Sequence, residues 1–355
     1  KKIPFTTGKQ GYTVTATSLP AEPGNDIPLV SGEGTAISPS NQNILLSEKV
    51  GLPKVIANGM AVDEIYKIKN VTVATGNINF TGSVIIDGDV NDGMKVIASG
   101  DVTVGGFVES ATIEAGGDVT ISGGIIGKKH DIEKTKVTDV AMSVSINAKG
   151  NIYAKYCQYA EISCSKDVRI ENQLLHSILN IQGGLKVGTE EKSNGKLIGG
   201  YIKAGTFVSA GIVGATAGSN TVIHFEHEMI KFKELMEDIE ERYKFDSEKT
   251  TELKAATNKL RKLPKDKVNP EILAKVISTY QFHAKRMGEL LLEKEALEQS
   301  TLEYMENVYI EATEKLHHGV QLIIDNFNDR TRREYGPSRM VYNERKIHIN
   351  PLVNT

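Results

Sequence analysis

The chain has 355 residues, of which 39% are hydrophobic and 25% are charged, and its formal net charge is −3. This composition is ordinary for a soluble globular protein, and the small net charge argues against a nucleic-acid surface that spans the whole molecule. No segment approaches the ~18 consecutive apolar residues of a membrane span. Only two cysteines occur, which favours a reducing compartment over secretion. The first residue is Lys1 rather than Met, so we expect a piece of a longer protein.

Residues 1–70 are expected to form a small β module. Residues 12–16 alternate in the manner of a strand, residues 44–46 and 54–56 read as further short strands, and Pro and Gly separate them. The repeat that follows needs a cap, because the open end of a stacked β structure exposes apolar side chains and unpaired backbone groups. We therefore expect this module to cover one end of the next domain.

An internal repeat dominates residues 75–127. Val or Ile recurs every sixth residue between Ile78 and Val108. Near copies of one triplet (glycine, then Asn or Asp, then Ile or Val) begin at Gly76, Gly88, Gly100 and Gly117. Strands that short, each ended by a turn residue, indicate a chain that changes direction every few residues, and no helix tolerates so much glycine. We predict a mainly β fold, a parallel β-helix over residues 71–223 whose coils cover one another.

A polar insertion interrupts this repeat at residues 128–143 and begins with Lys128, Lys129 and His130. Loops that leave a solenoid on one face often bind partners, so these three residues are candidate partner-binding residues. The alternative is a surface insertion that the fold merely tolerates.

Both cysteines fall within a second repeat. The repeated segments are 108–115, 157–164 and 197–204. The alignment places Cys157 in the position of Val108 and Cys164 in the position of Ala115. We therefore predict buried, unreactive thiols, with a redox or metal-binding pair as the alternative.

The periodicity becomes helical over residues 224–306. Apolar residues recur every seventh position in the first half, Pro264 and Pro270 break the pattern, and a second seam then alternates steps of four and three. These features predict an antiparallel coiled-coil hairpin, and the second helix alone is about 50 Å long at ~1.5 Å per residue. Residues 307–355 return to a period of two, so we expect a β segment that rejoins the β-helix.

The hairpin supplies the other candidate partner-binding residues. These are the apolar seam residues Met229, Met236, Tyr280 and Met287. His283 and Lys294 also lie on the seam, where polar residues set the register of a coiled coil. Asp246 interrupts the stripe of the first helix and is expected to mark a bend.

Catalytic chemistry is the competing hypothesis, since right-handed β-helices also serve polysaccharide-processing enzymes. The acids that could cluster for this purpose are Asp87, Asp89, Asp92 and Asp101. Asp after Gly is commonly a turn residue that hydrogen-bonds its own backbone, and we favour that role. His224 and His227 could share a helix face and bind a metal, but no third ligand is evident. The arginines and Lys346 within residues 330–346 form a basic region that could contact an acidic protein surface.

Three segments together with the hairpin resemble the flagellar assembly protein A family of bacteria. The segments are 75–80, 123–127 and 195–200. Residues 87–102 also resemble the β-helix of the C-terminal domain of septum-site protein C, a cell-division inhibitor. That domain is a right-handed, three-sided β-helix, which implies the same hand here.

The family resemblance implies a non-enzymatic cytoplasmic protein without a cofactor, tied to flagellum assembly and to its placement at the cell pole. It also implies a protein partner, with the unphosphorylated glucose-specific enzyme IIA of the sugar phosphotransferase system as a candidate. Self-association through the hairpin is a further expectation. No functional residue can be transferred from the family to this sequence.

Overall fold

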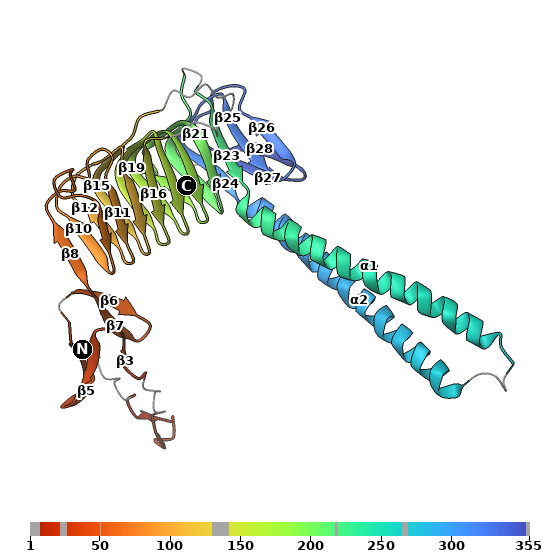
Figure 1. The fold of residues 1–355 in the computed structure, drawn as a ribbon. Coiled ribbons are helices and arrows are strands. Elements are labelled where there is room, and N and C mark those ends of the chain that lie inside the picture. The colour runs from red at the N-terminus through yellow and green to blue at the C-terminus, as the bar shows by residue number, and fades with distance from the viewer. Residues whose placement is uncertain are drawn as a thin grey trace.

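The protein was analysed as a computed structural model that describes residues 8–21, 27–49, 51–129, 142–216, 219–264 and 269–352. Three parts follow one another in Figure 1. A small β module lies near the N-terminus, a long stack of β coils forms the body, and two helices project from the far end of the body.

The N-terminal module consists of short strands in three separate sheets. The strands are β1 (Gly11–Tyr12), β2 (Ser18–Leu19), β3 (Val30–Ser31), β4 (Thr35–Ser38), β5 (Asn41–Ser47), β6 (Leu52–Ile56) and β7 (Gly59–Asp63). None of them pairs with a strand of the body within the described ranges, and an ion pair between Lys49 and Glu64 lies at the junction. The predicted strand at residues 12–16 is wrong beyond Tyr12, because the Thr13 hydroxyl accepts the N–H of Thr17 and the chain turns there.

The body is a parallel β-solenoid. Its strands are β8 (Ile65–Ile68), β9 (Ile78–Phe80), β10 (Ser83–Ile86), β11 (Lys95–Ala98), β12 (Val102–Val104), β13 (Val108–Glu109), β14 (Thr112–Ala115), β15 (Val119–Ile126), β16 (Val144–Ala148), β17 (Ile152–Gln158), β18 (Ala160–Cys164), β19 (Val168–Ile181), β20 (Leu185–Val187), β21 (Lys196–Ala204), β22 (Phe207–Val213) and β23 (Thr221–Phe225). Val84 lies beside Val102, 18 residues on. Three six-residue steps therefore make one coil, which explains the spacing of the sequence repeat.

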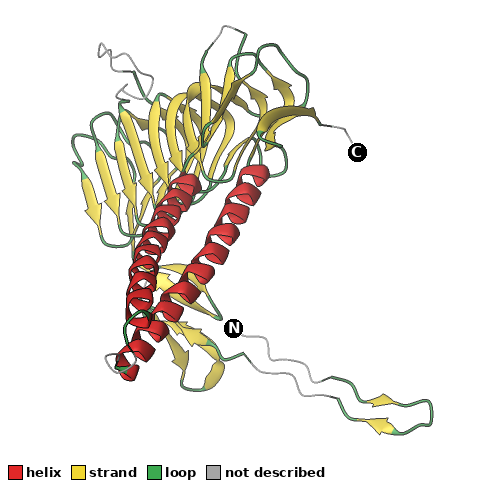
Figure 2. Ribbon diagram, turned by 90° about the vertical axis from the view of Figure 1, so that its right-hand side faces the viewer, coloured by secondary structure: helices red, strands yellow, loops and turns green. Residues whose placement is uncertain are grey.

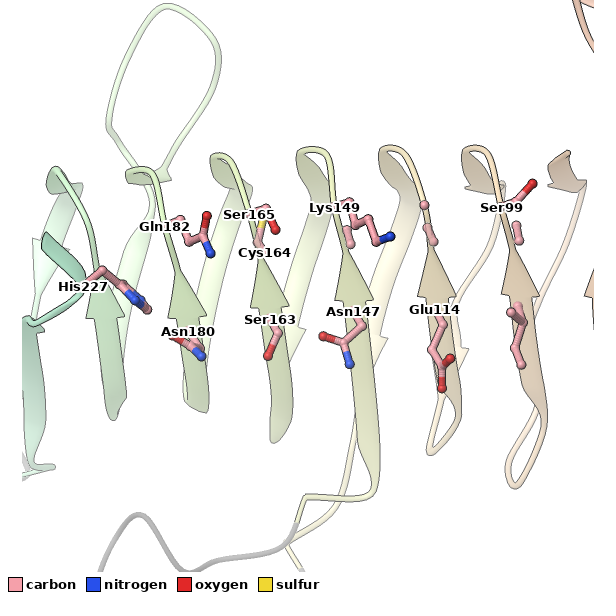
Figure 3. A pocket seen from close by; sticks show the side chains of 15 residues that line it. Ser99, Glu114, Asn147, Lys149, Ser163, Cys164, Ser165, Asn180, Gln182 and His227 are labelled. Atoms are coloured by element: carbon pink, nitrogen blue, oxygen red, sulfur yellow. The ribbon is translucent and has the colours of Figure 1, made fainter. Parts of the chain in front are cut away.

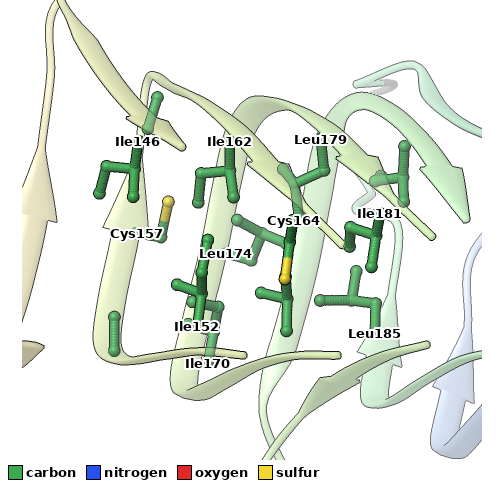
Figure 4. Packing of buried hydrophobic residues seen from close by; sticks show 14 of the residues in the cluster. Ile146, Ile152, Cys157, Ile162, Cys164, Ile170, Leu174, Leu179, Ile181 and Leu185 are labelled. Carbon is green, nitrogen blue, oxygen red and sulfur yellow. The ribbon is translucent and has the colours of Figure 1, made fainter. Parts of the chain in front are cut away.

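Apolar side chains from successive coils stack into columns inside the solenoid. One column contains, in register, Val90, Val108, Ile125, Cys157, Leu174 and Leu197. Every member of this column is at most 1% exposed. Figure 4 shows Cys157 near Ile146, Ile152 and Leu174, and Cys164 belongs to a different column, with Ala148 and Ile181. The burial of these closely packed apolar side chains is the main stabilising contribution to the solenoid.

A ladder of side-chain hydrogen bonds joins the turns. The carboxylate Oδ1 of Asp89 accepts the N–H of Phe107, and Oδ1 of Asp101 accepts the N–H of Asp118, both at 2.7 Å. The acids thus hold the turn of the next coil rather than their own. Glycine is required beside them, since a Cβ at Gly117 would lie 1.9 Å from Oδ1 of Asp101.

The helical arm is formed by α1 (His227–Arg261) and α2 (Pro270–Asn307), which run antiparallel. The helices lie apart in projection at the tip in Figure 1 and near the body in Figure 2, so the plane that holds both axes turns along the arm. Residues 221–225 pair as β23, so the first helix begins at His227 and not at residue 224. The N–H of Glu271 bonds to the side chain of Asn269, which caps α2.

The chain returns to the body after the arm. The remaining strands are β24 (Tyr309–Leu316), β25 (Val320–Ile324), β26 (Phe327–Arg330), β27 (Ser338–Asn343) and β28 (Lys346–Pro351). β24 and β25 extend the parallel stack, whereas β26, β27 and β28 pair antiparallel. This antiparallel group ends the solenoid on the side from which the arm projects (Figure 1).

Candidate functional site

The arm joins the body without a linker at either crossing. Glu226 alone separates β23 from α1, and Val308 alone separates α2 from β24. The rings of Phe232 and Tyr304 pack edge to face between the two helices, with centroids 5.7 Å apart. The Tyr304 hydroxyl donates to the carbonyl of Gly205 at 2.9 Å, and burial raises the pKa of this tyrosine. These contacts join the two helices to each other and α2 to the body.

Buried methionines and ion pairs strengthen the same root. Met229 and Met305 are each 5% exposed and belong to the apolar core of the solenoid. Lys233 of α1 forms an ion pair with Asp325, which follows β25, at 2.7 Å. The root of the arm is therefore continuous with the apolar core of the solenoid.

A charged cluster lies inside the arm, about halfway along α1. Asp246 is fully buried, and its two carboxylate oxygens lie 2.6 Å from Nδ1 of His283 and 3.3 Å from Nε of Arg286. Both partners come from α2, so the predicted register role of His283 has a physical partner. The helix α1 runs unbroken past Asp246, which the sequence had indicated as the site of a bend.

Ionic pairs also link the helices nearer the body. Arg242 pairs with Glu293 at 2.9 Å, and Lys294 pairs with Glu240 at 2.8 Å. All four side chains are at least one-third exposed, so each pair contributes little to stability by itself. Their effect is to favour this alignment of the helices over shifted ones.

Large apolar side chains remain exposed on the arm. Phe245 is 53% exposed and Phe282 is 57% exposed, and both rings lie beside the imidazole of His283. The guanidinium of Arg286 lies over the ring of Phe282. Phenylalanine and arginine are enriched in protein–protein interfaces, so this surface has the composition of an interface.

The predicted partner-binding residues of the arm lie along the seam between its two helices. Met229 is buried at the root, and Met236, Tyr280 and Met287 are half-buried. The Met287 sulfur accepts a hydrogen bond from Thr250 of the other helix. Partner binding by these four residues stays a prediction. The sequence did not single out Phe245 and Phe282, whose exposed rings are visible only in the structure.

The predicted residues of the insertion lie where the chain leaves one corner of the solenoid. Lys128 and Lys129 are exposed, and Lys129 forms an isolated antiparallel bridge with Met142. His130 lies outside the described residues. The binding role of these three residues also stays a prediction.

The acids proposed for catalysis are engaged in the scaffold or exposed. Asp89 and Asp101 accept backbone N–H groups, and Asp87 pairs with Lys67 at 3.1 Å. Asp92 is exposed, without a hydrogen bond or ion pair to the described residues. The backbone hydrogen bonds of Asp89 and Asp101 favour a structural role for these two acids over a catalytic one.

Both cysteines are buried free thiols, as predicted. Burial raises the pKa of Cys157 to about 12 and that of Cys164 to about 11. Thiols of this kind carry almost no nucleophilic thiolate near neutral pH.

A polar trough runs along one side of the solenoid, with a volume of about 510 Å³ (Figure 3). Residues on six adjacent coils form one row along the trough, because their strands pair in register. They are Ile97, Glu114, Asn147, Ser163, Asn180 and Lys203. Strands lie about 4.8 Å apart, so this row spans roughly 24 Å. Small side chains such as Ala115 and Ala148 form the floor.

His227, the first residue of α1, lies at one end of the trough, with its ring directed toward Asn180 and Gln182 (Figure 3). Burial lowers the pKa of this histidine, so the neutral imidazole predominates near pH 7. Its neighbour His224 is not a metal-binding companion but pairs through Nδ1 with the Tyr201 hydroxyl at 3.0 Å. Among the residues that the structure describes, no group of three His, Cys, Asp or Glu could hold a metal ion.

The fold and these surfaces define a class of protein, a β-solenoid with a projecting pair of antiparallel helices. A profile of the Flagellar Assembly Protein A beta solenoid domain matches residues 64–347, and a profile of the Flagellar Assembly Protein A N-terminal region matches residues 1–58. The chain therefore belongs to the flagellar assembly protein A family, and the resemblance seen in the sequence is confirmed. A comparison with curated proteins gave no match, and neither did one with solved structures. Neither α1 nor α2 is apolar enough over its described length to cross a membrane.

Proposed function

We propose that this protein is a non-enzymatic docking scaffold for flagellum assembly, in which the solenoid holds the helical arm in a fixed direction. The observation that carries this proposal is the absence of a linker at either crossing between body and arm. A helix pair that extends roughly 50 Å at ~1.5 Å per residue can present a partner well away from the body. Family membership supplies the process in which such a scaffold acts.

Two finer structural features belong to this proposal. The arm is a coiled coil, supported by the alternating steps of its seam and by the turning of the helix pair along its length. The coils of the solenoid wind right-handed, supported by the resemblance to septum-site protein C. A coiled coil would stiffen the arm, because each helix supports the other along its length.

The partner that we propose is the unphosphorylated glucose-specific enzyme IIA, with the protein acting in the cytoplasm at the cell pole. The docking surface would be the exposed side of the arm at Phe245 and Phe282, where Arg286 adds a cation. A phosphoryl group on the partner adds negative charge and would alter the fit to such a surface. A second copy of this chain is the competing occupant.

Isothermal titration with the purified enzyme IIA in both phosphorylation states tests this proposal. We expect binding of the unphosphorylated form, lost in the double variant Phe245→Glu, Phe282→Glu. The matched control is Leu292→Glu, because Leu292 is 68% exposed on α2 and lies ten residues after Phe282. No binding in either state would remove this partner. Binding that survives the double variant would remove the arm as its docking surface.

A further inference from the structure

The polar trough beside the arm has unpartnered hydrogen-bonding groups at regular intervals. The side chains of Asn147, Asn180 and Gln182 are exposed, and none has a hydrogen-bond partner among the described residues. Each primary amide offers a donor and an acceptor, which matches the C=O and N–H groups of a peptide backbone. Because the strands run across the trough, a ligand lying along it would be held by these side chains and not by strand pairing.

One end of the trough contains a buried polar atom that nothing in the described structure satisfies. Four buried side-chain nitrogen or oxygen atoms lack a hydrogen bond in the described residues. Three of them, on Arg242, Asp246 and Asp325, are held in ion pairs. The fourth is Nε2 of His227, and it has neither kind of partner. An unpaired buried nitrogen costs free energy, and a rotation of the His227 ring that brought Nε2 to a ligand atom would recover that cost.

The charge of the trough is set by Lys149, because Lys203, the last residue of the row, forms an ion pair with Glu226. Glu114 is neutralised by Lys95, whose ammonium lies 2.7 Å from its carboxylate. Lys149 lines the same trough and has no ion-pair partner in the described parts of the chain. The free cation therefore favours a ligand that carries a carboxylate.

We propose that this trough binds an extended acidic segment of a partner polypeptide. The segment would run along the solenoid axis with a carboxylate at Lys149 and a hydrogen-bonding group against Nε2 of His227. A row of roughly 24 Å accommodates about seven residues at ~3.3 Å each. No Phe, Tyr or Trp of the described residues lines the trough for a sugar to stack on, and a neutral glycan would gain no charge attraction from Lys149. This site does not depend on the proposed docking by the arm.

A random octapeptide library displayed on phage, selected on the full chain, tests the proposal. We expect the selected peptides to be enriched in Asp and Glu. The best of them, labelled with fluorescein, should lose at least tenfold in affinity on Lys149→Glu and on Asn180→Asp, measured by fluorescence polarisation. The matched control is Lys155→Glu, because Lys155 is an exposed lysine of the same solenoid outside the trough, and it should change affinity less than twofold.

His227→Phe provides the second variant, because phenylalanine keeps an aromatic ring at the root and removes the nitrogens. We expect weaker peptide binding with unchanged helical circular dichroism. In the wild-type protein, the ¹⁵N resonance of Nε2 should move when the peptide is added. The proposal is overturned if the selected peptides show no acidic enrichment, or if the trough variants bind them as well as the Lys155→Glu control does. It is also overturned if cellohexaose or maltohexaose binds in the trough and no peptide does.

Discussion

The carboxylate of Asp246 and the imidazole of His283 meet inside the helical arm, with Oδ1 and Nδ1 2.6 Å apart. One comes from α1 and the other from α2, and Asp246 is fully buried. A buried carboxylate is costly unless it is paired, so a shifted alignment of the helices that separated these two residues would be disfavoured. The pair therefore specifies how the helices lie against each other more than it stabilises them.

The first prediction concerns this pair. Asp246→Ala removes the carboxylate that His283 and Arg286 contact, and leaves buried polar atoms without partners. We expect the free energy of unfolding of the arm to fall by about 1–3 kcal/mol. The double variant Asp246→Leu, His283→Leu replaces both groups by apolar ones and should be as stable as the wild type or more so. Thermal unfolding followed by circular dichroism at 222 nm measures both.

The control for this experiment is Glu240→Ala, which breaks the exposed pair with Lys294. Its effect should stay below about 1 kcal/mol. A double leucine variant less stable than Asp246→Ala would show that the pair is a net source of stability, contrary to this account.

A second prediction concerns pH. Burial lowers the pKa of His224 and of His227, so the folded protein disfavours the protonated imidazoles. As the pH falls through the ordinary histidine pKa of about 6.5, the unfolded chain takes up these protons first and stability decreases. We expect a lower Tm at pH 5.5 than at pH 7.5, and a smaller difference in His224→Gln. An equal difference in the variant would show that His224 does not contribute.

A third prediction tests the ladder of turns. In Asp101→Asn the amide oxygen can still accept the N–H of Asp118, whereas in Asp101→Ala this N–H loses its partner. We expect Asp101→Ala to lose about 1–2 kcal/mol of stability in urea unfolding, and Asp101→Asn to lose well under half of that. Equal losses in the two variants would mean that the negative charge, and not the hydrogen bond, is what the turn requires.

A fourth prediction concerns the thiols. Cys157 and Cys164 are buried, with pKa values raised to about 12 and about 11, so a thiol reagent such as Ellman's reagent should react only slowly with the folded protein at pH 8. Both should react rapidly in guanidinium chloride. Fast reaction of one thiol in the native protein would show that its column in the solenoid opens locally.

The solenoid was predictable because its sequence repeats in register with its structure. Each six-residue step places one apolar residue inside, and 18 residues return the chain to the neighbouring coil, as Val84 and Val102 illustrate. The same logic placed Cys157 in an apolar position. The strand expected at residues 12–16 failed because Thr13 bonds locally to Thr17, and alternation alone does not reveal such a turn.

The candidate sites were less predictable for a physical reason. In the sequence, Asp246 only interrupts the apolar stripe of the first helix. Its partner, His283, lies 37 residues away and meets it only when the two helices are aligned. Asn147 and Asn180 occupy outward positions of the repeat, where any polar residue is compatible with the fold. Only the register of the coils brings them into one row beside His227.

A fixed arm is the central claim, and electron paramagnetic resonance distances test it most directly. Spin labels at Lys155→Cys on the solenoid and Lys259→Cys near the tip of α1 report the direction of the arm, since both lysines are exposed and the native thiols are buried. A control protein carries both labels on the solenoid, at Asn79→Cys and Lys155→Cys. It gives the width of the distance distribution expected for two labels on one rigid body. The account predicts one narrow distribution for the arm, as narrow as that of the solenoid pair. A broad distribution, or several separate distances, would contradict it.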